Sequence, residues 1–163
     1  MITDEAKRVR DNTKGTRTVI HTAASHGDLE VVRFFVEKAG YDINLRDEDG
    51  CTLLFYAAGG GCLEVVRYLI KKGADINATA KTGATALHIA ARVGHLEVIK
   101  CLVEEGGADK NTVDNNGYGV LDYNRGYDLL TAKATLFDKP NDAGSRVIDY
   151  NELNNEPNDK SIH

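Results

Sequence analysis

The stretch Thr85-Ala-Leu-His-Ile-Ala-Ala91 decides the fold, because close copies of it stand at two other places in the 163-residue chain. These copies are Thr18-Val-Ile-His-Thr-Ala-Ala24 and Thr52-Leu-Leu-Phe-Tyr-Ala-Ala58. Their threonines are 34 (52 − 18) and 33 (85 − 52) residues apart, a period typical of repeat arrays. One unit of this size cannot bury its apolar face alone, so we expect neighbouring units to stack.

Each copy predicts a first helix that begins at its threonine. A hydroxyl placed one residue before an apolar run can accept a hydrogen bond from the free N–H groups of the first turn. The alanine pair presents small side chains, so the first helices of adjacent units can approach closely. A glycine three residues after the second alanine then gives the left-handed end of the helix. These glycines are Gly27, Gly61 and Gly94.

A second helix is predicted after each of these glycines, since apolar residues recur there at helical spacing. Units 1 and 3 hold one extra residue at the end of this helix, which we expect a loop bulge to absorb. We expect Gly40, Gly73 and Gly106 to end the second helices, ahead of polar turns that form projecting loop tips. The apolar positions are Leu29, Val32, Phe35 and Val36; Leu63, Val66, Leu69 and Ile70; and Leu96, Ile99, Leu102 and Val103.

The composition fits a globular chain, with 42% hydrophobic and 28% charged residues and no stretch near the roughly 20 apolar residues of a membrane span. The net charge of −5 argues against nucleic acid as a partner, because phosphates are bound by basic stripes. The first residues lack the apolar run of a signal peptide, and three cysteines do not make a disulfide framework. We therefore expect a cytoplasmic chain with free thiols, the nucleus being a second compatible location.

The chain resembles the ankyrin repeat family over residues 15–117, because three elements recur in register. They are the Thr-x-[Leu/Ile]-[His/Phe]-x-Ala-Ala core, the Gly-[Asp/Cys/His]-Leu-Glu-Val step and the Asp-Ile-Asn ending. The resemblance implies an all-α solenoid of stacked helix-turn-helix units with projecting hairpin loops. It also implies a degenerate capping repeat at the C-terminal end, where Asn124-Arg125 replaces the alanine pair. The expected segments are an N-terminal segment (1–14), a repeat domain (15–138, with repeats 15–46, 47–79, 80–113 and the cap 114–138) and a polar C-terminal tail (139–163).

Two alternatives stay open for the tail. Its many Asn, Asp and Glu residues predict a poorly ordered segment. Residues 145–153 nevertheless have a helix start and an apolar set, which would suit packing against the array or a short partner motif.

We expect no catalytic, metal or cofactor site. The family's histidine is kept at His21 and His88 but replaced by Phe55, so an imidazole relay between repeats is interrupted there. The two histidines lie two units apart, roughly 20 Å, too far to share a metal ion. The triplet Gly59-Gly60-Gly61 lacks the Gly-Lys-Ser/Thr sequel of a phosphate loop. Cys51 is predicted at a loop tip, open to oxidants but without a neighbouring base.

The resemblance implies a non-enzymatic protein–protein interaction module: an adaptor, scaffold or inhibitor that is monomeric alone and binds another protein, not nucleic acid or a membrane. The alternative is a small-ligand or nucleotide-sensing array of the same family. In ankyrin-like proteins the loop tips and the exposed side of the first helices form a concave recognition surface. Carried over by register, the partner-binding positions are Thr22, Ser25, His26, Arg46, Glu48, Asp49, Tyr56, Lys81, Thr82, Ile89, Arg92, Val93, Asn115, Asn116, Tyr118 and Tyr123.

We place a central binding anchor on the first helices, because aromatic residues and arginine dominate hot spots and an exposed isoleucine would lack a folding role. Its members are Tyr56, Ile89, Arg92 and Tyr123. On this hypothesis, replacing Tyr56 and Arg92 by alanine abolishes partner capture and leaves the fold intact. Separately, Asn77 stands in a context that resembles the asparagine-hydroxylation site of ankyrin repeats. An unmodified turn asparagine is the competing interpretation.

Overall fold

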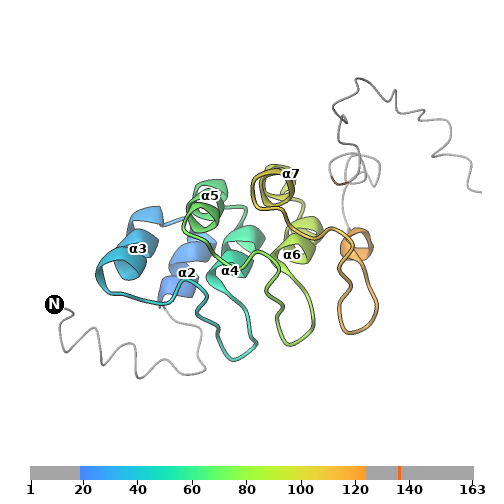
Figure 1. Cartoon of the computed structure of the whole chain (residues 1–163), viewed down its shortest axis with the longest axis horizontal. Helices are drawn as coiled ribbons and strands as arrows, with labels where there is room; N and C mark the ends of the chain where they lie inside the picture. Colours follow the sequence, from blue (N-terminus) through green and yellow to red (C-terminus); the bar gives the residue numbers. More distant parts are fainter. Residues whose placement is uncertain (1–18, 124–135, 137–163) are drawn as a thin grey trace, which may run out of the picture.

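The structure, a computed structural model, describes residues 19–123 and Leu136. Short helices alternate with turns and form two layers that run side by side (Figure 1). The first helices of the units are α2 (Val19–His26), α4 (Leu53–Gly60) and α6 (Ala86–Val93). The second helices are α3 (Leu29–Arg33), α5 (Leu63–Lys71) and α7 (Leu96–Lys100), and the 3-10 helix η3 (Val120–Tyr123) follows the last described loop. The predicted all-α stack of helix pairs is confirmed in this part of the chain.

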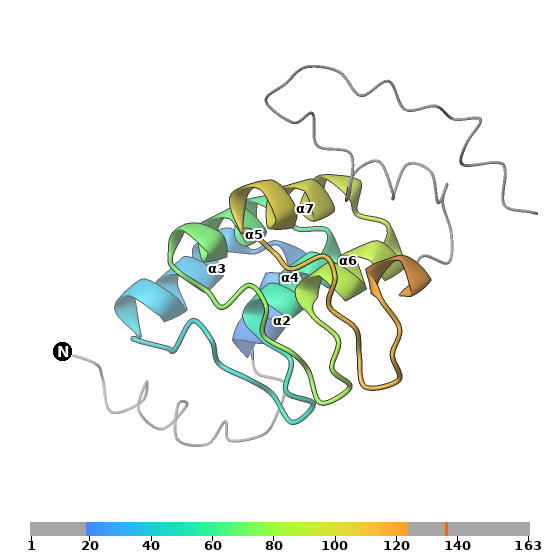
Figure 2. The same cartoon turned by 45° about the vertical axis from the view of Figure 1, so that its right-hand side comes forward.

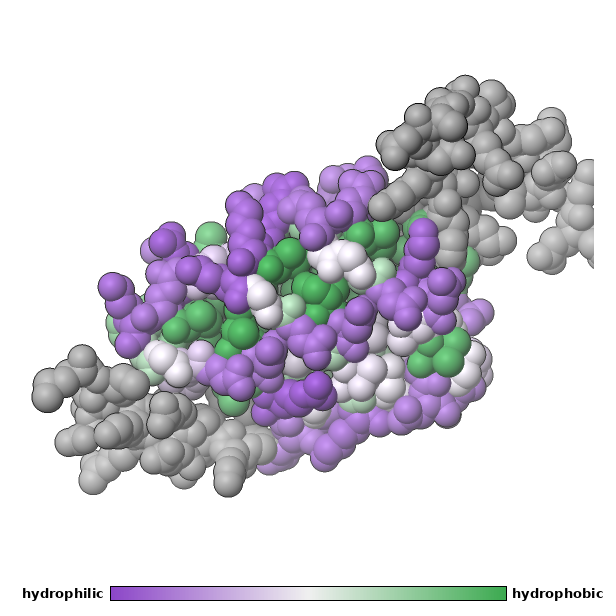
Figure 3. Space-filling model, viewed as in Figure 1, coloured by the Kyte–Doolittle hydropathy of each residue, from purple (hydrophilic) through white to green (hydrophobic). Residues whose placement is uncertain are grey.

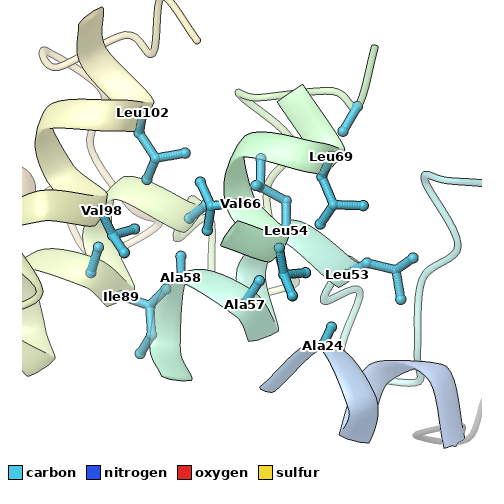
Figure 4. Packing of buried hydrophobic residues seen from close by; sticks show 14 of the residues in the cluster. Ala24, Leu53, Leu54, Ala57, Ala58, Val66, Leu69, Ile89, Val98 and Leu102 are labelled. Atoms are coloured by element: carbon cyan, nitrogen blue, oxygen red, sulfur yellow. The ribbon is translucent and has the colours of Figure 1, made fainter. Parts of the chain in front are cut away.

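The first helices pack against one another along the array, α2 on α4, α4 on α6 and α6 on η3. The alanine pairs allow this close packing, since Ala24, Ala57 and Ala58 have no exposed surface (Figure 4). The approach is closest at Gly60, where an added Cβ would overlap the carbonyl oxygen of Ser25. Small residues therefore set the spacing between neighbouring units.

The threonines cap the first helices as predicted. Oγ1 of Thr52 accepts a hydrogen bond from the N–H of Phe55 at 3.2 Å. In α6 the cap is reciprocal: the N–H of His88 donates to Oγ1 of Thr85 (3.5 Å), and the N–H of Thr85 donates to Nδ1 of His88 (3.1 Å). Thr18, the corresponding residue before α2, lies outside the described residues.

The extra residue of units 1 and 3 is absorbed inside the second helix, so the predicted loop bulge is wrong. α3 continues into the π-helical turn η1 (Phe34–Lys38), and α7 continues into η2 (Cys101–Glu105). The bond that closes η2 spans five residues, from the N–H of Gly106 to the carbonyl oxygen of Cys101 (3.1 Å). In unit 2, which lacks the insertion, α5 stays α-helical. A wider turn accommodates one more residue without moving the helix ends apart.

The left-handed glycine after the second helix is Gly107 in unit 3. Gly40 and Gly73 have φ values of 69° and 84°, as expected for glycines that end helices. Gly106, in contrast, has a right-handed conformation with φ −91°, and Gly107 takes the left-handed position with φ 65°. Gly106 thus follows the last residue of η2, as predicted, and Gly107 takes the left-handed position that Gly40 takes in unit 1.

The loops project from one side of the array and lie beside one another (Figure 2). Backbone hydrogen bonds join their tips: the N–H of Lys81 donates to the carbonyl oxygen of Asp49 (2.8 Å), and that of Asn115 donates to Thr82 (2.9 Å). Each loop is thus fixed to the next. The tip side chains are consequently presented in a defined order.

Hydrophobic surface gathers along the middle of the face seen in Figure 3, between hydrophilic margins. None of the described helices is long and apolar enough to cross a membrane. The predicted N-terminal segment (1–14), the capping repeat beyond residue 123 and the tail (139–163) lie outside the described residues, except for Leu136, which is buried.

Candidate functional site

A hollow of about 370 Å³ lies between the loops and the first helices, on the face where the sequence predicts partner binding. It brings together seven of the predicted positions: Asp49, Lys81, Thr82, Ile89, Arg92, Asn116 and Tyr123. Its other lining residues are Cys51, Phe55, Ala80, Ala84 and Asp114. A second hollow of about 420 Å³ shares Arg92, Asp114, Asn116 and Tyr123 with it and adds the predicted Tyr118.

Two tyrosines of the predicted anchor are tied to loop aspartates. The Tyr56 hydroxyl donates to Oδ2 of Asp47 at 2.6 Å, and its ring lies edge-on to the ring of His21, with centroids 5.4 Å apart. The carboxylate of Asp47 also accepts the N–H groups of Asp49 and Cys51, which shapes the loop tip. Tyr56 therefore has a folding role, which the anchor hypothesis did not include.

The same arrangement recurs two units further on. The Tyr123 hydroxyl donates to Oδ2 of Asp114 at 2.5 Å, and its ring lies edge-on to that of His88, with centroids 4.9 Å apart. Oδ1 of Asp114 accepts from the N–H groups of Asn116 and Tyr118. The bond from Tyr123 is the largest contribution that lowers the pKa of Asp114, while burial and then Asp114 raise the pKa of Tyr123 to about 12.

The intervening unit differs at both positions of the pair. Ala80 occupies the aspartate position and Ile89 the tyrosine position. Ile89 is only 8% exposed and lies so close to Gly59 that an added Cβ there would stand 3.2 Å from its side chain. The prediction of an exposed isoleucine without a folding role is therefore wrong: Ile89 packs at the interface of α4 and α6.

The buried histidines have structural roles. Nε2 of His21 donates to the carbonyl oxygen of Leu45 (3.2 Å), and Nε2 of His88 donates to that of Tyr118 (3.3 Å). Desolvation lowers the pKa of His88, which favours the neutral ring. The middle unit has Phe55 in this place, a half-buried ring that packs against the hydrophobic core.

Two of the predicted tip residues hold neighbouring loops together. Nη1 of Arg46 donates to the carbonyl oxygen of Thr79 (2.7 Å), and Nδ2 of Asn115 donates to that of Lys81 (2.7 Å). Glu48 and the side chain of Lys81 are exposed at the tips. The tip positions thus divide into side chains that fix the loops and side chains that face solvent.

The remaining predicted positions do not line the hollow. On α2, the Ser25 hydroxyl and Nδ1 of His26 both bond the carbonyl oxygen of Thr22, each at 2.8 Å. Val93, at the end of α6, is 45% exposed. Asn77 is exposed, and its Oδ1 accepts from the backbone N–H of Asp109 at 2.9 Å, which bridges two repeats.

The prediction that the Cys51 thiol is open to oxidants is wrong. Its side chain is buried, and desolvation, with smaller contributions from Asp47 and Asp49, raises its pKa to about 11. The nucleophilic thiolate is therefore disfavoured. Within residues 19–123 and Leu136, no group of three or more His, Cys, Asp or Glu side chains is arranged to hold a metal ion.

Comparison with known proteins points to one family. A family profile described as ankyrin repeats (3 copies) matches residues 2–80, and a profile described as ankyrin repeat matches residues 82–115. The chain is 38% identical over 68 residues to the E3 ubiquitin-protein ligase Ufd4 of Drosophila melanogaster, and 42% identical over 57 residues to the protein phosphatase 1 regulatory subunit 12A of Mus musculus. It is 43% identical over 56 residues to the Notch-regulated ankyrin repeat-containing protein of Homo sapiens.

These alignments cover 42%, 35% and 34% of this chain, respectively. They cover 2%, 5% and 48% of the three relatives. The chain therefore spans less than half the length of each of these proteins.

Proposed function

The chain belongs to the ankyrin repeat family, and from this membership we propose that it is a non-enzymatic module that binds a protein partner through the concave face of its repeats. Proteins that carry similar repeats include a regulatory subunit of a phosphatase. An adaptor, scaffold or inhibitor binds in this way without a reaction of its own. The partner's identity is not implied by the relatives, since the aligned regions are short parts of the larger ones.

The observation that carries the proposal is the hollow between the loops and α6. Apolar side chains form part of its lining. The exposed Arg92 also lines it and makes no ion pair or side-chain hydrogen bond with residues 19–123. Val93 and Tyr118, 45% and 56% exposed, add apolar surface at other predicted partner-binding positions. Exposed apolar surface beside arginine is typical of protein interfaces.

Capture of partners by two charge-reversal variants tests the proposal. The concave variant carries Lys81→Glu and Arg92→Glu, two residues that line the hollow. The matched convex variant carries Lys71→Glu and Lys100→Glu, on the second helices α5 and α7, with the same change in net charge. We expect the concave variant to lose proteins that the wild type and the convex variant both capture, as measured by quantitative mass spectrometry. Equal capture by the concave variant, or loss with the convex variant alone, would reject the concave face as the binding surface.

A small ligand is the second candidate, because a hollow of about 370 Å³ is large enough for one. A nucleotide-sensing array predicts that the ligand raises the unfolding temperature, since a ligand stabilises the state it binds. Thermal unfolding with a panel of nucleotides therefore separates the two candidates. No shift with any nucleotide, together with partner capture that is lost in the concave variant, supports the protein-binding module.

A further inference from the structure

A paired substitution inside the repeats lies in the lining of the hollow. At this position units 2 and 4 have a tyrosine, in α4 and η3 respectively, that is bonded to an aspartate on the loop, at 2.6 Å and 2.5 Å. In unit 3, Ala80 stands in place of the aspartate and Ile89 in place of the tyrosine, so both hydrogen-bonding groups of the pair are missing. Both Ala80 and Ile89 line the hollow.

The floor of this space is apolar. Ile89 and Ala84 are buried beneath it, and Phe55 of α4 is half-buried at its side. Tyr123, bonded to its aspartate, bounds it on the side of η3. An apolar side chain of a partner that entered here would be desolvated on several sides, which is the environment of a binding hot spot.

The charged groups around the hollow differ in whether their hydrogen-bonding capacity is used. Asp114 already accepts three hydrogen bonds, from Tyr123 and two backbone N–H groups. Arg92 is exposed, and within residues 19–123 neither its side chain nor that of Lys81 forms an ion pair or a hydrogen bond. Asp49 lies at the tip, on the side of unit 2. On α6, the charged group that lines the hollow is thus the donor Arg92, whose complement is an acceptor such as a carboxylate.

We propose that the hollow over Ile89 binds a linear protein segment in which an aliphatic or aromatic side chain stands next to an aspartate or glutamate. The apolar side chain fills the space left by Ala80 and Ile89, and the carboxylate pairs with Arg92. The proposal rests on the concave face being the protein-binding surface, and it names the chemistry of the segment that this surface selects.

A peptide array probes this selection with the full chain. The peptides carry a Gly-Ser frame in which two positions, adjacent or one residue apart, are varied over every pair of natural amino acids. We expect pairs of an apolar residue with Asp or Glu to bind roughly tenfold better than the Gly-Gly peptide, the scale of one hot-spot contact. An array without such pairs above the Gly-Gly peptide, or one that selects Lys or Arg beside the apolar residue, overturns the proposal.

Two variants assign the contacts. Ala80→Asp with Ile89→Tyr restores the pair that the chain itself uses in units 2 and 4, and should close the hollow while the protein remains folded. We expect this double variant to lose binding of the selected peptides. The exposed Arg92→Gln should keep the preference for an apolar residue but lose the preference for an acid. Peptide binding unchanged in the double variant contradicts the proposed position of the apolar side chain.

Arg92→Gln keeps the proposal falsifiable even if the double variant unfolds, because unchanged acid preference in this surface variant contradicts the ion pair. The peptide array and the capture experiment also test different proposals, the first the chemistry of the bound segment and the second the binding surface. Partner capture that depends on the concave face, combined with an array that selects no apolar–acidic pair, rejects this inference while the protein-binding function stands.

Discussion

The tyrosine–aspartate pairs are the residue-scale feature that the structure adds to the repeat pattern. Tyr56 and Tyr123 each bond a loop carboxylate and pack edge-on to a buried histidine. They connect three parts of the array, since the loop, the first helix and the preceding first helix meet at one side chain. Tyr56 and Tyr123, at positions predicted for partner binding, thus also connect the loops to the helices.

Removing one hydroxyl should measure this connection. Tyr56→Phe keeps the ring but removes the bond to Asp47, and a hydrogen bond to a charged group contributes about 1.5–3 kcal/mol when buried. Because Tyr56 is half-buried, we expect a loss of roughly 1–2 kcal/mol in the free energy of unfolding by urea. Tyr118→Phe, which alters a 56% exposed ring, is the control. Equal urea midpoints for both variants would contradict a structural role of the Tyr56 hydroxyl.

The buried imidazole of His88 should make stability depend on pH. Burial lowers its pKa below the ordinary 6.5, so the unfolded chain takes up this proton at a higher pH than the folded protein. Its contribution is complete above about pH 6.5 and is lost as the pH falls through the lowered pKa. We expect the urea midpoint to decline from about pH 7 to pH 5.

His88→Phe introduces the residue that unit 2 has at this position, Phe55. It should make the decline of the urea midpoint with falling pH shallower, whatever its effect on absolute stability. His26→Gln, which alters an exposed ring of α2, is the matched control. Identical slopes for the wild type and His88→Phe would show that the imidazole is not the group responsible.

At the scale of elements, the one-residue insertions show how a repeat absorbs a change of length. Units 1 and 3 widen the end of the second helix into a π-helical turn and keep the loops in register. A loop bulge would have moved the aspartate and asparagine that begin each loop. The interloop bond from the N–H of Asp109 to Asn77, at 2.9 Å, is kept in this arrangement.

Deletion of Gly106 should convert η2 to an α-helical end, because the shortened segment matches unit 2, from Tyr68 to Asp75, in length. We expect a folded protein with unchanged helical circular dichroism and a urea midpoint at or above that of the wild type. Gly106→Ala should instead destabilise the protein by about 1–3 kcal/mol, since the new Cβ would stand 2.7 Å from the carbonyl oxygen of Leu102. A deletion more damaging than the substitution would contradict this description of the turn.

The helices could be predicted from the sequence because their signals are local. Threonine caps, alanine pairs and apolar periodicity each act within one unit, and three copies reinforce one another. The insertions could not be placed in the same way, since a π-helical turn and a loop bulge have the same sequence length. Which of them forms depends on contacts with neighbouring units.

The candidate site was predicted less well than the helices. Whether a side chain at a first-helix position is exposed depends on its contacts with the preceding loop, as for Tyr56 and Tyr123. The tips and Arg92 fall on one face as the repeat register implies. The burial of Ile89 was missed, although a signal was present: tyrosine follows an aspartate nine residues earlier in units 2 and 4, whereas isoleucine follows Ala80. This difference between the units distinguishes Tyr56 and Tyr123, which bond a loop aspartate, from Ile89, which has none.

At the scale of the whole molecule, stability comes from the contacts between units. The buried apolar residues form one continuous cluster through the described repeats. Leu87→Ala removes a side chain that is 1% exposed, and we expect it to cost about 2–5 kcal/mol in the free energy of unfolding. The surface substitution Arg92→Gln is the comparison, with little expected effect on the urea midpoint. A loss below about 1 kcal/mol for Leu87→Ala would contradict a tightly packed stack.

Hydrogen–deuterium exchange of the full chain, alone and bound to a captured partner, tests the concave binding surface most directly. We predict slower exchange on binding in residues 80–93 and 114–123, and unchanged exchange on the outer helices α3, α5 and α7. Protection confined to the outer helices, with residues 80–93 exchanging as in the free protein, would contradict it.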